Sequence, residues 1–101
     1  MKKLECIIRP DRLTMVEQAL RAEAINGMTI SEVKGFGRQR RTATTKVKLE
    51  IYVMEMELDR VLTVIHRAAY TGKVGDGKIA VLPLDDVMRI RTKERGAKAL
   101  L

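Results

Sequence analysis

The chain has 101 residues, which fits one domain over residues 1–101, and a domain of this size has a small core that favours association with copies of itself. No stretch approaches the roughly 18 apolar residues that cross a membrane, the apolar start is too short for a signal peptide, and the lone Cys6 excludes an intrachain disulfide. We therefore expect a cytoplasmic protein. The net charge of +7 indicates an anionic partner, which could be nucleic acid, a membrane surface, a nucleotide or a small acid.

The first half of the chain predicts a strand, a helix and a second strand. Residues 2–9 form an apolar-rich segment closed by Pro10. Thr14 and Glu17 have the spacing of a capping box, which predicts that a helix begins there and runs to about residue 24. Asn26-Gly27 indicates a turn, and residues 27–35 are expected to form the second strand. Residues 35–45 are polar and aperiodic, so we expect a mobile loop.

The second half begins with the clearest strand pattern in the chain. Apolar and polar residues alternate over residues 46–54, and residues 57–70 have the spacing of an amphipathic helix. A glycine-rich loop over residues 71–77, a strand over 78–82 and a short fifth strand over 87–91 follow. The tail, residues 92–101, is basic and has no assignable structure. The order β-α-β-β-α-β predicts an α+β, ferredoxin-like domain. We expect its second sheet face to carry apolar side chains as well, and a symmetric homo-oligomer would cover that face.

The glycine-rich loop is the strongest candidate site. Residues 72–78 match G-x-x-x-x-G-K, but Ile79 replaces the Ser or Thr of a Walker A motif, and the loop joins a helix to a strand rather than a strand to a helix. Glycines still allow backbone N–H groups to converge on an anion, and Lys78 adds a positive charge. The alternative is an ordinary helix-to-strand turn.

Other charged and polar residues carry weaker signals. Arg89 and Arg91 lie two apart, so on a strand both guanidinium groups would leave one face, where they suit phosphate or carboxylate. A solvated strand edge is the alternative. His66 has no nearby metal-binding partner in the sequence and is interpreted as a surface or packing residue, and Cys6 as a buried core thiol. No nucleophile–base set is present, so we expect no enzyme activity.

The loop sequence TGKVGDGKI, residues 71–79, resembles the B-loop signature of the PII signal-transduction family. The resemblance continues through other segments in the family's order, and together they cover most of the chain: residues 2–10, 27–39, 46–51 and 88–92. It implies trimers of ferredoxin-like subunits that bind ATP or ADP in the clefts between subunits. It also implies a signal-transduction regulator of energy and carbon/nitrogen status that can sense 2-oxoglutarate and act on a target enzyme or transporter.

The resemblance assigns site residues by position. The phosphates would be cradled by four residues of the B-loop (residues 71–78), Gly75, Asp76, Gly77 and Lys78, together with Arg38. Arg89 and Arg91 would reach the phosphates from the adjacent subunit. The base and ribose would be lined by Gly27, Met28, Thr29, Glu50 and Tyr52. Gln39 would be a magnesium ligand, and Lys46 the partner of a 2-oxoglutarate carboxylate. The nucleotide-binding residues would be Gly27, Met28, Thr29, Gly37, Arg38, Glu50, Tyr52, Gly75, Asp76, Gly77, Lys78, Arg89 and Arg91.

The output loop, the T-loop of this family, departs from the pattern. The family has a long excursion after Gln39, whereas here a shortened T-loop over residues 38–45 remains. Residues 40–45 contain no tyrosine or serine, which excludes uridylylation there.

Two alternatives to the nucleotide sensor remain open. The first is a PII-like sensor of adenylates or bicarbonate in carbon metabolism. The second is a nucleic-acid-binding ferredoxin-like domain, and it is disfavoured because Phe36, Tyr52 and Tyr70 are the only aromatic residues and no aromatic-rich RNA-binding strand is present. We expect no nucleic-acid partner and no direct insertion into a membrane.

Overall fold

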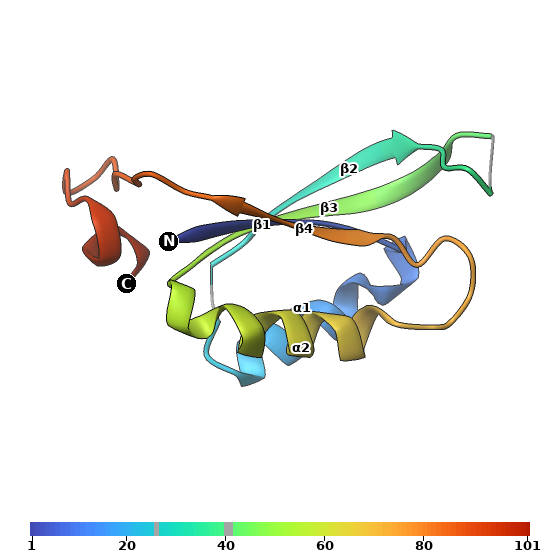
Figure 1. Ribbon diagram of the computed structural model, residues 1–101, viewed down its shortest axis with the longest axis horizontal. Coiled ribbons are helices and arrows are strands. Elements are labelled where there is room, and N and C mark those ends of the chain that lie inside the picture. The colour runs from blue at the N-terminus through green and yellow to red at the C-terminus, as the bar shows by residue number, and fades with distance from the viewer. Residues whose placement is uncertain (26, 40–41) are drawn as a thin grey trace.

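The computed structural model describes residues 1–25, 27–39 and 42–101. Four strands form one antiparallel sheet, and two helices cover one of its faces (Figure 1). The elements are β1 (Lys2–Ile8), α1 (Leu13–Ala22), β2 (Thr29–Gly35), β3 (Thr44–Val53), α2 (Leu58–Ala69) and β4 (Lys78–Pro83). Short 3-10 turns span Pro10–Arg12, Glu55–Glu57 and Gly96–Leu100. Across the described residues, no helix is long and apolar enough to cross a membrane.

The strand order is β2-β3-β1-β4, with β1 paired to both β3 and β4. Together with the two helices on one face, this is the split βαβ arrangement, and it confirms the ferredoxin-like fold. The helix expected over residues 57–70 is one residue shorter at each end, and the strand expected over residues 78–82 extends one residue further.

The core lies between the sheet and the helices. Alternate residues of β1 and β3 point into it, which is what a strand with one covered face requires. The buried residues are Leu4, Cys6, Ile8, Val16, Leu20, Val47, Leu49, Ile51, Val53, Val61, Ile65 and Ala69. Cys6 is therefore the expected core thiol, and burial raises its pKa to about 12.

The capping box predicted at Thr14 is wrong. Helix α1 begins at Leu13, its N-cap residue is Arg12, and no side chain caps it. Pro10 starts a 3-10 turn that runs directly into the helix, and the Leu13 N–H donates to the Pro10 carbonyl. Because the turn already supplies acceptors to the first helical N–H groups, Thr14 lies inside the helix.

The fifth strand predicted over residues 87–91 is also wrong. The only ladder contact there is an isolated bridge between Met88 and Arg95. The chain reverses at Lys93, whose φ is +64°, and the Arg89 N–H donates to the Glu94 carbonyl at 2.8 Å. This segment therefore pairs with itself rather than with the sheet.

The loop after β2 is shorter than expected. Thr44 and Thr45 belong to β3 and pair with Gly35 and Lys34 of β2. Arg40 and Arg41 of the expected loop, and Asn26 of the expected turn, lie outside the described residues.

The uncovered sheet face is less apolar than expected. Its centre carries an ion-pair cluster in which the Lys3 ammonium lies 3.0 Å from a carboxylate oxygen of Glu5 and 3.0 Å from one of Glu50. These carboxylates raise the pKa of Lys3, with Glu50 the larger cause. The rest of the face is mixed: alternation places the apolar Ile7 of β1 and Leu82 of β4 on it, and Lys48 and Lys78 lie opposite Ile7 on the neighbouring strands.

Replacement of one core residue tests this packing. Leu49→Ala removes a side chain with 0% exposure, and we expect it to lower the free energy of unfolding by about 2–5 kcal/mol. Met56→Ala removes one that is 89% exposed and should change it by less than about 0.5 kcal/mol. Denaturant unfolding measures both values, and equal effects would contradict the assignment of the core.

Candidate functional site

The loop between α2 and β4 depends on its glycines. Gly72, Gly75 and Gly77 have φ of +83°, +100° and +96°, a region that other residues rarely adopt. Gly77 also lies against β1, where an added Cβ would be 1.7 Å from the Ile7 carbonyl oxygen. Only glycine fits at this position, so the loop can meet the end of β1 directly.

Asp76 holds the loop together from inside. Its Oδ2 accepts hydrogen bonds from the N–H groups of Thr71 and Gly72, both at 2.9 Å. Its Oδ1 accepts from the Thr71 hydroxyl and, at 2.8 Å, from Nε of Arg9. These donors, with the Thr71 hydroxyl the largest cause and Arg9 the next, hold the pKa of Asp76 well below its usual range. The carboxylate therefore stays ionised in a basic environment.

Two basic side chains tie the loop to the sheet. Arg9, directly after β1, donates from Nη2 to the Val74 carbonyl at 2.6 Å as well as binding Asp76. Lys46 of β3 donates from Nζ to the Gly75 carbonyl. Lys46, expected to meet a 2-oxoglutarate carboxylate, is thus already at the loop.

The loop forms one side of a cavity of about 520 Å³. Residues 37–39, which follow β2, form the other side. The cavity brings together the expected phosphate ligands and the expected magnesium ligand, along with two residues that were not assigned: Gly37, Arg38, Gln39, Lys73, Val74, Gly75, Asp76, Gly77 and Lys78. Arg38, Gln39 and Lys78 are exposed there, so their polar groups can reach a ligand.

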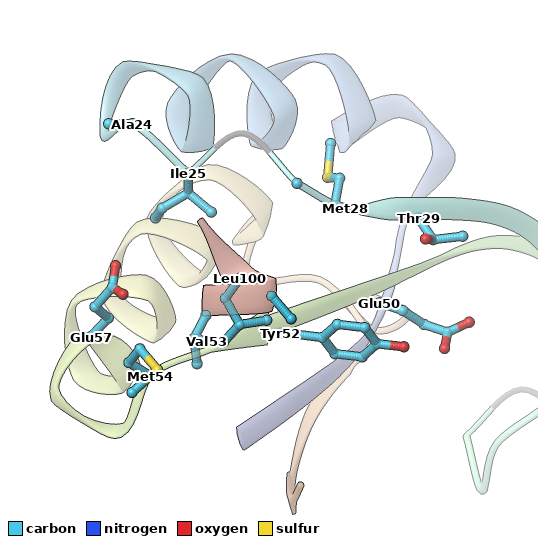
Figure 2. Close-up of a pocket in the computed structure, with 12 residues that line it drawn as sticks. Ala24, Ile25, Met28, Thr29, Glu50, Tyr52, Val53, Met54, Glu57 and Leu100 are labelled. Atoms are coloured by element: carbon cyan, nitrogen blue, oxygen red, sulfur yellow. The ribbon is translucent and has the colours of Figure 1, made fainter. Parts of the chain in front are cut away.

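A second cavity, of about 340 Å³, lies between the start of β2 and the end of β3 (Figure 2). All five residues expected to line a base and ribose line it: Gly27, Met28, Thr29, Glu50 and Tyr52. Lys3 lowers the pKa of Glu50 through a hydrogen bond. Ala99 and Leu100 of the tail also line the cavity, although the tail carried no sequence signal for a site.

The two cavities lie at opposite ends of the sheet. In Figure 1 the loop before β4 is at one end, and the tail and the N-terminus are at the other. Strand β3 runs between them, from Lys46 beside the loop to Tyr52 in the second cavity. Glu50 and Tyr52, which both line the second cavity, lie four and six residues along the strand from Lys46, or about 13 and 20 Å at the usual rise.

Of the two arginines expected to reach the phosphates from the adjacent subunit, Arg89 is bound within its own chain and Arg91 is not. Arg89 donates to Oε1 of Glu94 at 3.0 Å and to the Ala99 carbonyl at 3.3 Å. The sequence did not indicate this ion pair, because it depends on the chain reversal at Lys93. Arg91 is exposed, and the described residues offer it no hydrogen bond or ion pair.

His66 is exposed on α2, with its ring 5.4 Å from that of Tyr70, as expected of a surface residue. Sequence reasoning missed Arg9 and Thr71 as contributors to the site. In the sequence, Arg9 is a charged residue between an apolar strand and Pro10, and no local pattern indicates that it binds Asp76, which lies 67 positions away.

Comparison with known proteins decides the family. The sequence model for "Nitrogen regulatory protein P-II" matches residues 1–94. The chain belongs to the P-II family. Its members are regulatory proteins, which agrees with the expectation that the chain is not an enzyme.

Relatives match this family member along its whole length. It is 41% identical to nitrogen regulatory protein P-II of Azospirillum brasilense, 43% to nitrogen regulatory protein GlnK of Escherichia coli strain K12 and 45% to P-II of Synechocystis. Each match covers 99% of this chain and 100% of the relative. The crystal structure of Arabidopsis thaliana PII bound to citrate has a TM-score of 0.88 and 46% identity, covering 97% of this chain and 87% of that one.

A pair of glycine replacements tests the loop geometry. Gly77→Ala places a methyl group against the Ile7 carbonyl at a positive φ, so the loop must move, and we expect a lower melting temperature and faster amide exchange over residues 71–78. Gly35→Ala, where nothing lies within 4 Å of the added Cβ, should leave both nearly unchanged. Similar behaviour of the two variants would contradict the close approach to β1.

Proposed function

We propose that this chain is a cytoplasmic, homotrimeric regulator that binds ATP or ADP between its subunits and signals through a target enzyme or transporter. The observation that carries the proposal is the cavity beside the glycine loop, which collects the exposed Arg38 and Lys78 around two glycines with positive φ, Gly75 and Gly77. A loop of this kind and two free cationic groups suit a polyphosphate.

The separation of the two cavities supports a site made by two copies. The cavity with the loop suits phosphates, and the one with Met28, Thr29 and Tyr52 suits a base and ribose. Because about 13–20 Å of β3 separates them in one chain, we expect a single nucleotide to take its phosphate contacts from one copy and its base contacts from the next. A head-to-tail arrangement of this kind closes into a ring, and three copies form the expected trimer.

The arginines fit the same arrangement. Arg89 contacts the Ala99 carbonyl, and Ala99 lines the base cavity. Arg89 therefore lies at the end of the sheet that carries the base cavity, which we call the base end. In a ring, that end would face the neighbour's phosphate cavity. Arg91 could then reach a phosphate directly, whereas Arg89 would first exchange its contacts with the tail.

The phosphate cavity also has groups suited to a magnesium-bridged dicarboxylate. Gln39 lines it, and its amide oxygen is a suitable ligand for Mg²⁺. Lys46 reaches the Gly75 carbonyl at the cavity's rim and could turn toward a carboxylate. The structural relative from Arabidopsis thaliana was solved with citrate, which is also a carboxylate. We therefore place 2-oxoglutarate here, next to Mg-ATP.

A shortened T-loop would change the output of the regulator. The matches above span 112 aligned positions and this chain has 101 residues, so at least 11 positions face a gap in it. We place the gap at residues 38–45. A six-residue connection from Gln39 to Lys46 leaves little chain to extend into a partner, so we propose that the target is recognised without a long loop.

The structure gives little support to nucleic-acid binding. Tyr52 is the one aromatic residue within the four strands as described. A stacking surface for bases would need more than one.

Lys78 provides the first test. Lys78→Ala should weaken ATP and ADP binding more than about tenfold, since one charge-assisted contact is lost. Lys34→Ala removes the same charge from an exposed position on β2 that lines none of the described cavities, and it should have little effect. Titration calorimetry measures both affinities, and unchanged affinity in Lys78→Ala would exclude the glycine loop as the phosphate site.

Calorimetry of 2-oxoglutarate tests the second ligand. We expect binding in the presence of Mg-ATP and none in its absence, with lower affinity than in long-loop relatives because less chain wraps the ligand. Binding of equal strength without nucleotide would refute the magnesium-bridged arrangement. Absence of binding under both conditions would favour the sensor of adenylates or bicarbonate.

A further inference from the structure

We propose that Asp76 and Arg9 are positioning residues of the anion site, and that they hold the glycine loop in its binding shape without touching the nucleotide. The inference rests on the proposed nucleotide site. It also changes the role of Asp76, which the resemblance places among the phosphate ligands.

The acceptor capacity of Asp76 is the first argument. An ionised carboxylate offers about four lone-pair positions. Oδ2 uses two for the N–H groups of Thr71 and Gly72, and Oδ1 uses two for Arg9 Nε and the Thr71 hydroxyl. No acceptor position remains for a magnesium ion or for a hydroxyl of the ligand, although Asp76 lines the cavity.

The geometry of Arg9 is the second argument. Its planar guanidinium reaches two parts of the loop at once, with Nε on Asp76 and Nη2 on the Val74 carbonyl. It follows β1 directly, and the side chain of Ile8 before it is buried in the core. Arg9 thus fixes the loop relative to β1. A lysine ammonium group has donors as well, but it lacks the planar fork that places Nε and Nη2 on two separate acceptors.

Charge makes the proposal testable by the sign of an effect. A carboxylate beside an anion site repels the anion, so its removal should strengthen binding if charge alone mattered. If Asp76 instead maintains the loop, its removal weakens binding. Asn in its place would retain one acceptor but turn an N–H₂ group toward the donors of Arg9 or Thr71.

The experiment measures ADP and ATP affinity by calorimetry, each with EDTA and with Mg²⁺, in Asp76→Asn and Arg9→Lys. We expect a loss of at least about tenfold for Asp76→Asn with and without Mg²⁺, and a smaller loss for Arg9→Lys, which keeps its charge. The double variant should lose little more than Asp76→Asn alone, since both changes break one network. Asp85→Asn, an exposed carboxylate with no hydrogen bond or ion pair in the described structure, is the matched control and should bind as the parent does.

A second measurement tests whether these contacts hold the loop, independently of nucleotide binding. Amide exchange over residues 71–78 without ligand should accelerate in Asp76→Asn and in Thr71→Val, and Thr71→Ser should restore protection because the hydroxyl returns. Tighter or unchanged ADP binding in Asp76→Asn would overturn the proposal, and a loss seen only with Mg²⁺ would make Asp76 a metal ligand instead. If the parent protein binds no nucleotide, the proposed function fails, while the exchange data still decide whether these contacts hold the loop.

Discussion

The pairing of β1 with β3 on one side and β4 on the other places both halves of the candidate site. Seven consecutive residues of β1 face β3, from Lys2 opposite Val53 to Ile8 opposite Val47. At one end of this ladder, Arg9 and the Ile7 carbonyl contact the glycine loop. Near the other end, Lys3 contacts Glu50, a residue of the base cavity. A register shift by one residue would turn every one of these side chains to the opposite face.

The length of the sheet then determines the kind of site the protein can form. Strand β3 separates the phosphate cavity from the base cavity by about 13–20 Å, so in the proposed site neither cavity alone holds a whole nucleotide. The uncovered face, which carries the ion-pair cluster together with apolar residues and further lysines, remains available for contact with other copies. In the proposed trimer, the neighbouring copy that covers the sheet also completes the nucleotide site, so assembly and ligand binding depend on the same contacts.

Local patterns predicted most of the fold correctly. Strands and helices with one covered face have a periodic apolar pattern, and this pattern predicted them. Examples are the alternation of Val47, Leu49 and Ile51 and the helical spacing of Val61 and Ile65, all of which are buried. The Thr14 cap failed because Pro10 had already started a turn, and the fifth strand failed because the chain reverses at Lys93.

Less of the candidate site than of the fold could be predicted from the sequence. Most of the residues that the resemblance named line one of the two cavities, whereas Arg89 and Arg91 line neither. The resemblance could not assign the internal role of Asp76, because that role depends on Arg9, which lies 67 positions away. Nor could it show that Arg89 is engaged by Glu94 and the tail, since those contacts exist only once the chain has reversed.

Mixing of two inactive variants tests the shared site most directly. Lys78→Ala damages the phosphate end of a subunit and Arg91→Ala the base end, so each variant alone should bind ATP weakly at every site. When the two are unfolded together and refolded, roughly a quarter of the sites should combine two intact ends and recover the parent affinity in calorimetry. Recovery of tight binding in the mixture is the result this account predicts. A mixture that binds no better than its separate components would contradict a site built from two copies.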